Sequence, residues 1–134
     1  MQKRMNSILG KPCMGFTMTD PEEAYAHMNY EVVEHYGDKY NGHYLYLWDE
    51  GYKLLGRCKA CGGYILIQRS EMHGSEDDYY GDYFPVSGSE EAKGLNERYD
   101  GYQLEEEFPE RYLMESNGSI SWSLSHEDRM SIRE

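Results

Sequence analysis

The feature that most constrains the fold is the segment Cys58-Lys59-Ala60-Cys61-Gly62-Gly63. The residues on either side of it, 52–57 and 64–69, have the apolar and polar pattern that is typical of β-strands. The two glycines permit the positive φ angles that a tight turn requires. We therefore expect an antiparallel hairpin with two cysteines at its tip, where both sulfurs can point at one metal ion.

Two cysteines separated by two residues on such a turn are typical of one half of a tetrahedral zinc site. A redox-active pair is an alternative, but in thioredoxin-like proteins this motif opens a helix, and Gly62-Gly63 makes a poor first helical turn. Free thiols that bind nothing are a second alternative. The spacing favours Zn²⁺ over both of them.

A closed structural zinc site needs four ligands, so two more must come from elsewhere in the chain. Cys13 is the remaining thiol, lies in the turn-like segment 11–15, and is the expected third ligand. His73 is the favoured fourth ligand, because it follows the second strand of the hairpin and the chain can double back there. The other histidines stay open as alternatives for that position: His27, His35, His43 and His126.

The charge of the chain restricts its partners. The 134 residues include 13 Lys and Arg against 25 Asp and Glu, a formal net charge of −12. Nucleic acids and anionic membranes bind basic surfaces, so we expect direct contact with neither. No apolar run approaches the roughly 20 residues of a membrane span, and residues 1–10 lack the apolar stretch of a secretory signal. The expected location is the cytoplasm.

Helix signals occur twice along the chain. Asp20 and Pro21 are expected to begin a helix that runs to about Tyr36, with an apolar stripe at positions 24, 28, 32 and 36. A second helix is expected between residue 87 and about Tyr99, because serines and two glutamates stand at its start.

Strand and turn signals occupy the rest of the chain. Residues 41–48 are expected to pair with the cysteine hairpin in a three-stranded meander, and residues 102–104 to form a short strand. The turn signal Asn117-Gly118 is expected to join strands at 111–115 and 119–124. The fold class is therefore α+β, a small single domain over residues 1–134 with an antiparallel sheet of about five or six strands, a zinc-knuckle hairpin and two helices. Residues 1–18 form an N-terminal segment that carries a metal ligand, and residues 125–134 a frayed tail.

Acidic residues and tyrosines gather in two places, residues 71–83, expected to form a loop, and residues 99–110. Tyrosine is a favoured anchor of protein interfaces, and carboxylates around it attract a basic partner. An alternative is that many of the 14 tyrosines fill a core that has only 3 Phe, and that residues 105–107 are simply solvated. The predicted partner-binding residues are Glu76, Asp77, Asp78, Tyr79, Tyr80, Asp82, Glu105, Glu106 and Glu107.

Catalytic motifs are missing from the sequence. It contains no phosphate-binding glycine loop before a helix, no Gly-x-Ser-x-Gly and no His-Glu-x-x-His. A zinc deaminase would need Pro-Cys-x-x-Cys, but Arg57 precedes Cys58. We therefore expect a protein that is not an enzyme and assign no catalytic residue.

Two resemblances add to this interpretation. The Cys58–Gly63 turn resembles the knuckle of a zinc ribbon, although the second Cys-x-x-Cys of a ribbon is absent. The whole chain, small and strongly acidic, looks like the acidic inhibitors encoded by phages, among them anti-CRISPR proteins that block a Cas effector. This second resemblance implies a stoichiometric inhibitor of a basic, nucleic-acid-handling protein such as a CRISPR-Cas nuclease, which obstructs its nucleic-acid loading. Together with the predicted zinc site, it leads us to expect a zinc-stabilised, non-enzymatic inhibitor. The alternatives are an immunity protein that neutralises a nuclease toxin, a zinc-dependent enzyme, and a housekeeping zinc-knuckle adaptor.

Overall fold

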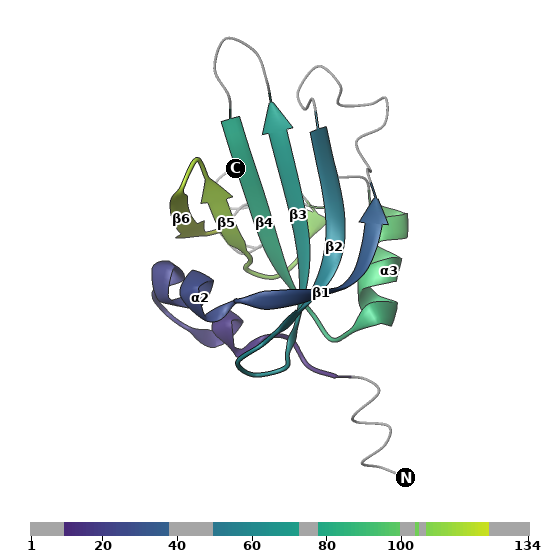
Figure 1. Ribbon diagram of the computed structural model, residues 1–134, viewed down its shortest axis with the longest axis horizontal. Coiled ribbons are helices and arrows are strands. Elements are labelled where there is room, and N and C mark those ends of the chain that lie inside the picture. The colour runs from purple at the N-terminus through teal and green to yellow at the C-terminus, as the bar shows by residue number, and fades with distance from the viewer. Residues whose placement is uncertain (1–9, 38–49, 73–77, 100–103, 105–106, 124–134) are drawn as a thin grey trace.

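One antiparallel sheet of six strands organises the protein, seen in a computed structural model that describes residues 10–37, 50–72, 78–99, 104 and 107–123 (Figure 1). Each strand pairs with its neighbour in sequence, in the order β1-β2-β3-β4-β5-β6. The strands are β1 (Tyr30–Gly37), β2 (Glu50–Cys58), β3 (Tyr64–Met72), β4 (Asp78–Val86), β5 (Leu113–Ser116) and β6 (Ser119–Trp122). The helices whose bounds lie within the described residues are a 3₁₀ turn η1 (Met14–Thr17), α2 (Pro21–His27) and α3 (Ser89–Arg98). This architecture confirms the α+β class.

Helix α2 begins as the sequence predicts and ends much earlier. The Asp20 carboxylate accepts a hydrogen bond from the Glu22 N–H at 3.4 Å, and Pro21 occupies the first turn. The prediction that the helix continues to Tyr36 is wrong, because the chain leaves the helix at Met28 and enters β1 at Tyr30.

The apolar stripe of that predicted helix explains the error. Ala24 and Met28 are buried in the core as expected, whereas Val32 and Val33 lie on β1 and are 56% and 46% exposed. Both valines are β-branched, which favours a strand over a helix. The positions 24, 28 and 32 match a helical period by coincidence, across the end of one element and the start of another.

The cysteine hairpin forms as predicted from β2 and β3, which pair in continuous antiparallel register from Glu50↔Glu71 to Arg57↔Tyr64. Its neighbour on the other side of β2 is β1, with Tyr30 opposite Cys58. The strand predicted at 41–48 lies outside the described residues, as does the predicted tail 125–134.

The sequence predicts an acidic loop over residues 71–83. This prediction is wrong for residues 78–83, which lie in a strand. Residues 78–86 form β4, which pairs with β3 over its whole length. The alternation of the strand buries Asp82 and Phe84 on one face and Tyr83 on the other. Asp82 is 6% exposed and accepts a hydrogen bond from Gln68 Nε2 at 3.2 Å, so its carboxylate belongs to the interior.

Both faces of the central strands are covered. On one face Ile65, Ile67 and Leu113 pack with Ala24 and Met28 of the α2 region. On the other, the core contains Ala92 of α3 together with Leu55, Leu66, Phe84, Val86, Leu104, Phe108 and Tyr112. Figure 1 shows α2 and α3 on opposite sides of the molecule. The α2 side is the one that positions the candidate site.

Two C-terminal predictions have different outcomes. Leu104 is helical rather than part of a strand, because its carbonyl accepts a hydrogen bond from the Phe108 N–H at 3.0 Å; residues 102 and 103 lie outside the described range. The Asn117-Gly118 turn is confirmed, with φ of 50° and 91° between β5 and β6. No helix in the described part of the chain is long and apolar enough to cross a membrane.

Two glycines provide a matched test of this fold. Gly118 has φ of +91°, whereas Gly94 lies in α3, where a Cβ would have nothing within 4 Å of it. Gly118→Ala should lower the free energy of unfolding by roughly 1 kcal/mol, because alanine is strained at positive φ. Gly94→Ala should raise it by about 0.5–1 kcal/mol through helix propensity. Urea unfolding of both variants measures the two changes in the free energy of unfolding. If both changes had the same sign, the assigned turn and helix would be contradicted.

Candidate metal centre

Three cysteines and a histidine meet at the tip of the β2–β3 hairpin. One ligand atom from each of Cys13, His27, Cys58 and Cys61 lies within 4.8 Å of all the others. A tetrahedral Zn²⁺ with Zn–S bonds of about 2.3 Å holds its sulfurs about 3.8 Å apart. The Sγ atoms of Cys61 and Cys13 are 3.8 Å apart. The cluster has donor types and a spacing that can hold a metal ion.

The hairpin tip places two of these sulfurs. The Cys58 N–H donates to the Gly63 carbonyl, and the Gly62 N–H donates to the Cys58 carbonyl, each at 2.8 Å. Gly62 closes the turn with φ of +76°, a conformation that favours glycine. These backbone constraints bring Cys58 and Cys61 to the same side of the hairpin.

The N-terminal segment brings the third sulfur to the hairpin. The Tyr64 N–H donates to the Lys11 carbonyl at 2.8 Å, and the Cys13 N–H donates to the Tyr64 carbonyl at 3.1 Å. The two backbones approach so closely that a Cβ on Gly63 would lie 2.5 Å from Cys13 Cα. Cys13 is therefore held beside the tip by a short parallel bridge that only glycine at position 63 permits.

The chain between Cys13 and α2 is anchored to the C-terminal hairpin. Arg111 Nη2 donates to the carbonyls of Phe16 and Met18 at 2.8 and 3.0 Å. The Trp122 indole N–H donates to the Thr19 carbonyl at 2.9 Å. These bonds fix the path of the chain from Cys13 to His27.

His27 is the last residue of α2, which ends directly over the hairpin. Its Nε2 atom is buried and has no hydrogen-bond partner within the described part of the chain. A buried ring nitrogen without a hydrogen bond destabilises the folded state, and coordination to a metal ion would remove that penalty. The Lys59 N–H donates to the Asn29 carbonyl at 2.8 Å, and the Cys58 thiol contacts the His27 carbonyl at 3.3 Å, so the helix end and the turn are held together.

Backbone N–H groups surround the sulfurs. Met14 N–H points at Cys61 Sγ and Gly15 N–H at Cys13 Sγ, both with N···S of 3.4 Å. Burial opposes ionisation of the Cys61 thiol, but the Met14 N–H, the His27 side chain and the Gly63 N–H lower its pKa to about 6. Burial raises the pKa of the Cys13 thiol well above its usual range. A bound cation is what would deprotonate Cys13 at neutral pH.

The predicted metal ligands have different outcomes in the structure. Cys13, Cys58 and Cys61 come together as the sequence predicts. The favoured fourth ligand, His73, lies outside the described residues, and His27 from the open alternatives completes the cluster. His35 lies on β1, where its ring stacks on Tyr52 at 5.5 Å. His43 and His126 are outside the described range. His27 could have been found from the position of the helix end. The apolar stripe wrongly predicts that end near Tyr36.

The predicted partner-binding residues do not form one described surface. Asp82 is buried, Tyr80 is half-buried and Glu107 is exposed. Asp78 and Tyr79 belong to β4. The remaining members of the set lie outside the described residues: Glu76, Asp77, Glu105 and Glu106.

Comparisons of this chain with known protein families, with curated protein sequences and with solved structures give no match. The resemblances to a zinc ribbon and to phage-encoded inhibitors therefore stay predictions.

Gly63→Ala tests the contact that places Cys13. A Cβ at 2.5–2.6 Å from backbone atoms of Pro12 and Cys13 forces the N-terminal segment away from the hairpin. We expect a loss of about 1–3 kcal/mol in the free energy of unfolding together with weaker metal binding. Chemical denaturation and a competitive chelator titration measure both. Ala60→Ser, at an exposed position of the same turn, is the control, and equal metal affinity in the two variants would refute the role given to the bridge.

Proposed function

We propose that this chain is a zinc-binding protein in which Cys13, His27, Cys58 and Cys61 hold one structural Zn²⁺. The observation that supports it is the convergence of four ligand atoms within 4.8 Å of one another, from segments far apart in the sequence. The buried Nε2 of His27, with no partner in the described residues, supports it independently.

The donor set argues for the identity of the metal. Three thiolates and one imidazole are the soft and borderline ligands that Zn²⁺ takes in structural sites. Carboxylate-preferring ions such as Mg²⁺ and Ca²⁺ are disfavoured by the same donors. Copper and iron accept the same donors, and elemental analysis distinguishes them from zinc.

The number of protein ligands argues for a structural role. A catalytic zinc usually keeps a position open for water or substrate, whereas four protein ligands complete a tetrahedron. The proposed ion would join the N-terminal segment, the end of α2 and the β2–β3 hairpin. We therefore propose stabilisation of the fold, not catalysis, as its task.

Metal analysis of paired histidine variants tests this proposal. The purified chain should contain one zinc per molecule, and Co²⁺ substitution should give the visible spectrum of a tetrahedral thiolate site. His27→Ala should weaken metal binding by more than about 100-fold, since even a lost hydrogen bond to a metal ligand costs about 10–100-fold. His35→Ala, at an exposed position on β1, should leave the metal affinity unchanged. Chelation should lower the melting temperature by at least about 10 °C.

A zinc content near zero in the wild-type chain would overturn the proposal. Full metal content in His27→Ala would overturn the assignment of the fourth ligand and return that position to His73 and the other open alternatives.

We also propose that this metal-stabilised scaffold binds and inhibits a basic, nucleic-acid-handling protein in the cytoplasm, such as a CRISPR-Cas nuclease. The supporting observation is the excess of exposed acids over exposed bases in the described residues. The exposed acids are Asp20, Glu22, Glu23, Glu31, Glu90, Glu91, Glu97, Glu107 and Glu110, and the exposed bases Lys11, Arg57, Lys59, Lys93 and Arg98. Such a surface is complementary to a nucleic-acid-binding groove.

Charge neutralisation tests the partner proposal. Glu105→Gln, Glu106→Gln and Glu107→Gln together should weaken binding to a purified Cas effector about tenfold or more, and binding should fall further in high salt. The control neutralises three exposed acids elsewhere, Glu22, Glu23 and Glu31, and should have a smaller effect. Binding to a nuclease toxin instead would favour the immunity-protein alternative. Salt-independent binding, or none to either protein, would refute the proposal.

A further inference from the structure

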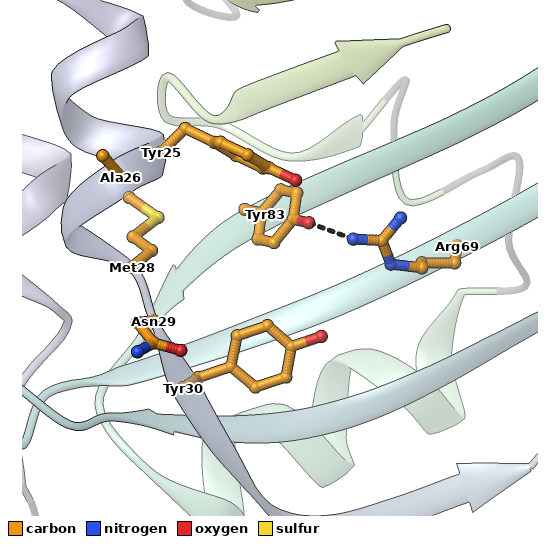
Figure 2. A pocket seen from close by; sticks show the side chains of 7 residues that line it. All are labelled: Tyr25, Ala26, Met28, Asn29, Tyr30, Arg69 and Tyr83. Atoms are coloured by element: carbon orange, nitrogen blue, oxygen red, sulfur yellow. Dashed lines mark hydrogen bonds between the residues drawn. The ribbon is translucent and has the colours of Figure 1, made fainter. Parts of the chain in front are cut away.

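A second candidate site lies beside the metal centre, on the same face of the sheet. It is a pocket of about 510 Å³ between α2, the start of β1, β3 and β4. Figure 2 shows the rings of Tyr25 and Tyr83 on one side, Tyr30 across the gap, and the Arg69 guanidinium facing the tyrosine hydroxyls. We propose that this tyrosine–arginine pocket binds a small aromatic monocarboxylate.

Arg69 is the cation that would receive the carboxylate. Its Nη2 donates to the Tyr83 hydroxyl at 2.6 Å, and its Nη1 lies 3.4 Å from Glu115 Oε1. The guanidinium also lies over the Tyr83 ring, 5.8 Å from its centroid. Because arginine carries five N–H donors in a rigid plane, these contacts fix its orientation and still leave donors for a ligand.

The tyrosines provide the walls of the pocket. Tyr25 and Tyr83 meet edge to face with their centroids 5.7 Å apart, and the Tyr25 hydroxyl is held by Glu115 Oε2 at 3.4 Å. Tyr30 lies against the sheet over Gly56, where a Cβ would come within 2.7 Å of its ring. The rings therefore stand at defined positions on two sides of the gap, and an aromatic body can stack or pack edge to face with them.

The hydroxyls favour a ligand rich in acceptors. Burial raises the pKa of Tyr83 above its usual value, so this group stays a neutral O–H donor at physiological pH. It accepts the Arg69 N–H, which leaves its own proton for another acceptor. An arginine N–H edge and a tyrosine O–H together match the two oxygens of a carboxylate.

The local charge favours a monoanion over a dianion. Arg69 is the only cation that lines the pocket within the described residues, and the nearby Glu115 carboxylate offsets part of its charge. The chain as a whole carries −12. A phosphate dianion would meet one partly neutralised cation, whereas a planar carboxylate needs only one guanidinium edge. The volume lies within the roughly 300–1,000 Å³ of small-molecule sites.

NMR titration of the full chain with three matched probes tests the proposal. Phenylacetate should shift amide resonances of residues 25–30, 69 and 83, and should bind at least about tenfold more tightly than neutral phenylacetamide, because a charge-assisted hydrogen bond contributes that much. Phenyl phosphate should bind more weakly than phenylacetate. Arg69→Gln should weaken phenylacetate binding about tenfold or more, and Arg69→Lys, which keeps the charge but loses the fork, by an intermediate factor.

Arg98→Gln is the matched control, since Arg98 is exposed on α3, and it should leave affinity within about twofold of the wild type. Tyr30→Phe, which keeps the ring and removes the hydroxyl, should weaken binding less than Arg69→Gln. Equal affinity for phenylacetate and phenylacetamide, tighter binding of phenyl phosphate, or no shift at millimolar phenylacetate would each overturn the proposal. The wild-type probe comparison decides the matter even if Arg69→Gln does not fold.

Discussion

The close approach of the N-terminal segment to the β2–β3 turn is the contact on which the rest of the site depends. Backbone hydrogen bonds on both sides of Tyr64 align residues 11–13 with the hairpin, and Gly63 has no side chain to prevent it. Cys13 thereby meets two cysteines about fifty positions away in sequence, 3.8 Å from Cys61 in space. Long-range closure of this kind costs chain entropy, which a bound metal offsets.

The sequence predicted the local parts of the site, because each depends on residues that are neighbours along the chain. A Cys-x-x-Cys followed by two glycines specifies a turn through φ and spacing alone, and Asn117-Gly118 does the same for the second hairpin. Cys13 was expected as the third ligand because it is the one cysteine outside the Cys58–Gly63 turn. His27 could not be assigned in the same way, because its place in the cluster depends on where α2 ends. The helical period of positions 24, 28 and 32 led us to place that end too late.

The acidic segment shows a second limit of sequence patterns. Asp82 lies between Gly81 and Tyr83 in an acidic stretch, so composition alone suggested an exposed loop. In the sheet it faces Gln68 on β3, in register with buried Lys53 on β2, and the Lys53 ammonium donates to the Tyr99 carbonyl at 3.0 Å. A polar layer of this kind is tolerable only because its members bond to one another and to the backbone. Those partners come from separate strands, which no local pattern reveals.

The candidate metal centre and the proposed tyrosine–arginine pocket share one short stretch of chain, the junction between α2 and β1. His27 belongs to the first site, and Tyr30, three residues later, is one wall of the second and pairs with Cys58 in the sheet register. The Lys59–Asn29 hydrogen bond ties that junction to the Cys58–Gly63 turn. An ion that fixes His27 and Cys58 therefore also fixes Tyr30 relative to Arg69. The two sites are thus linked by ordering of the same backbone, and by reciprocity a ligand that orders Tyr30 would favour the metal-bound form.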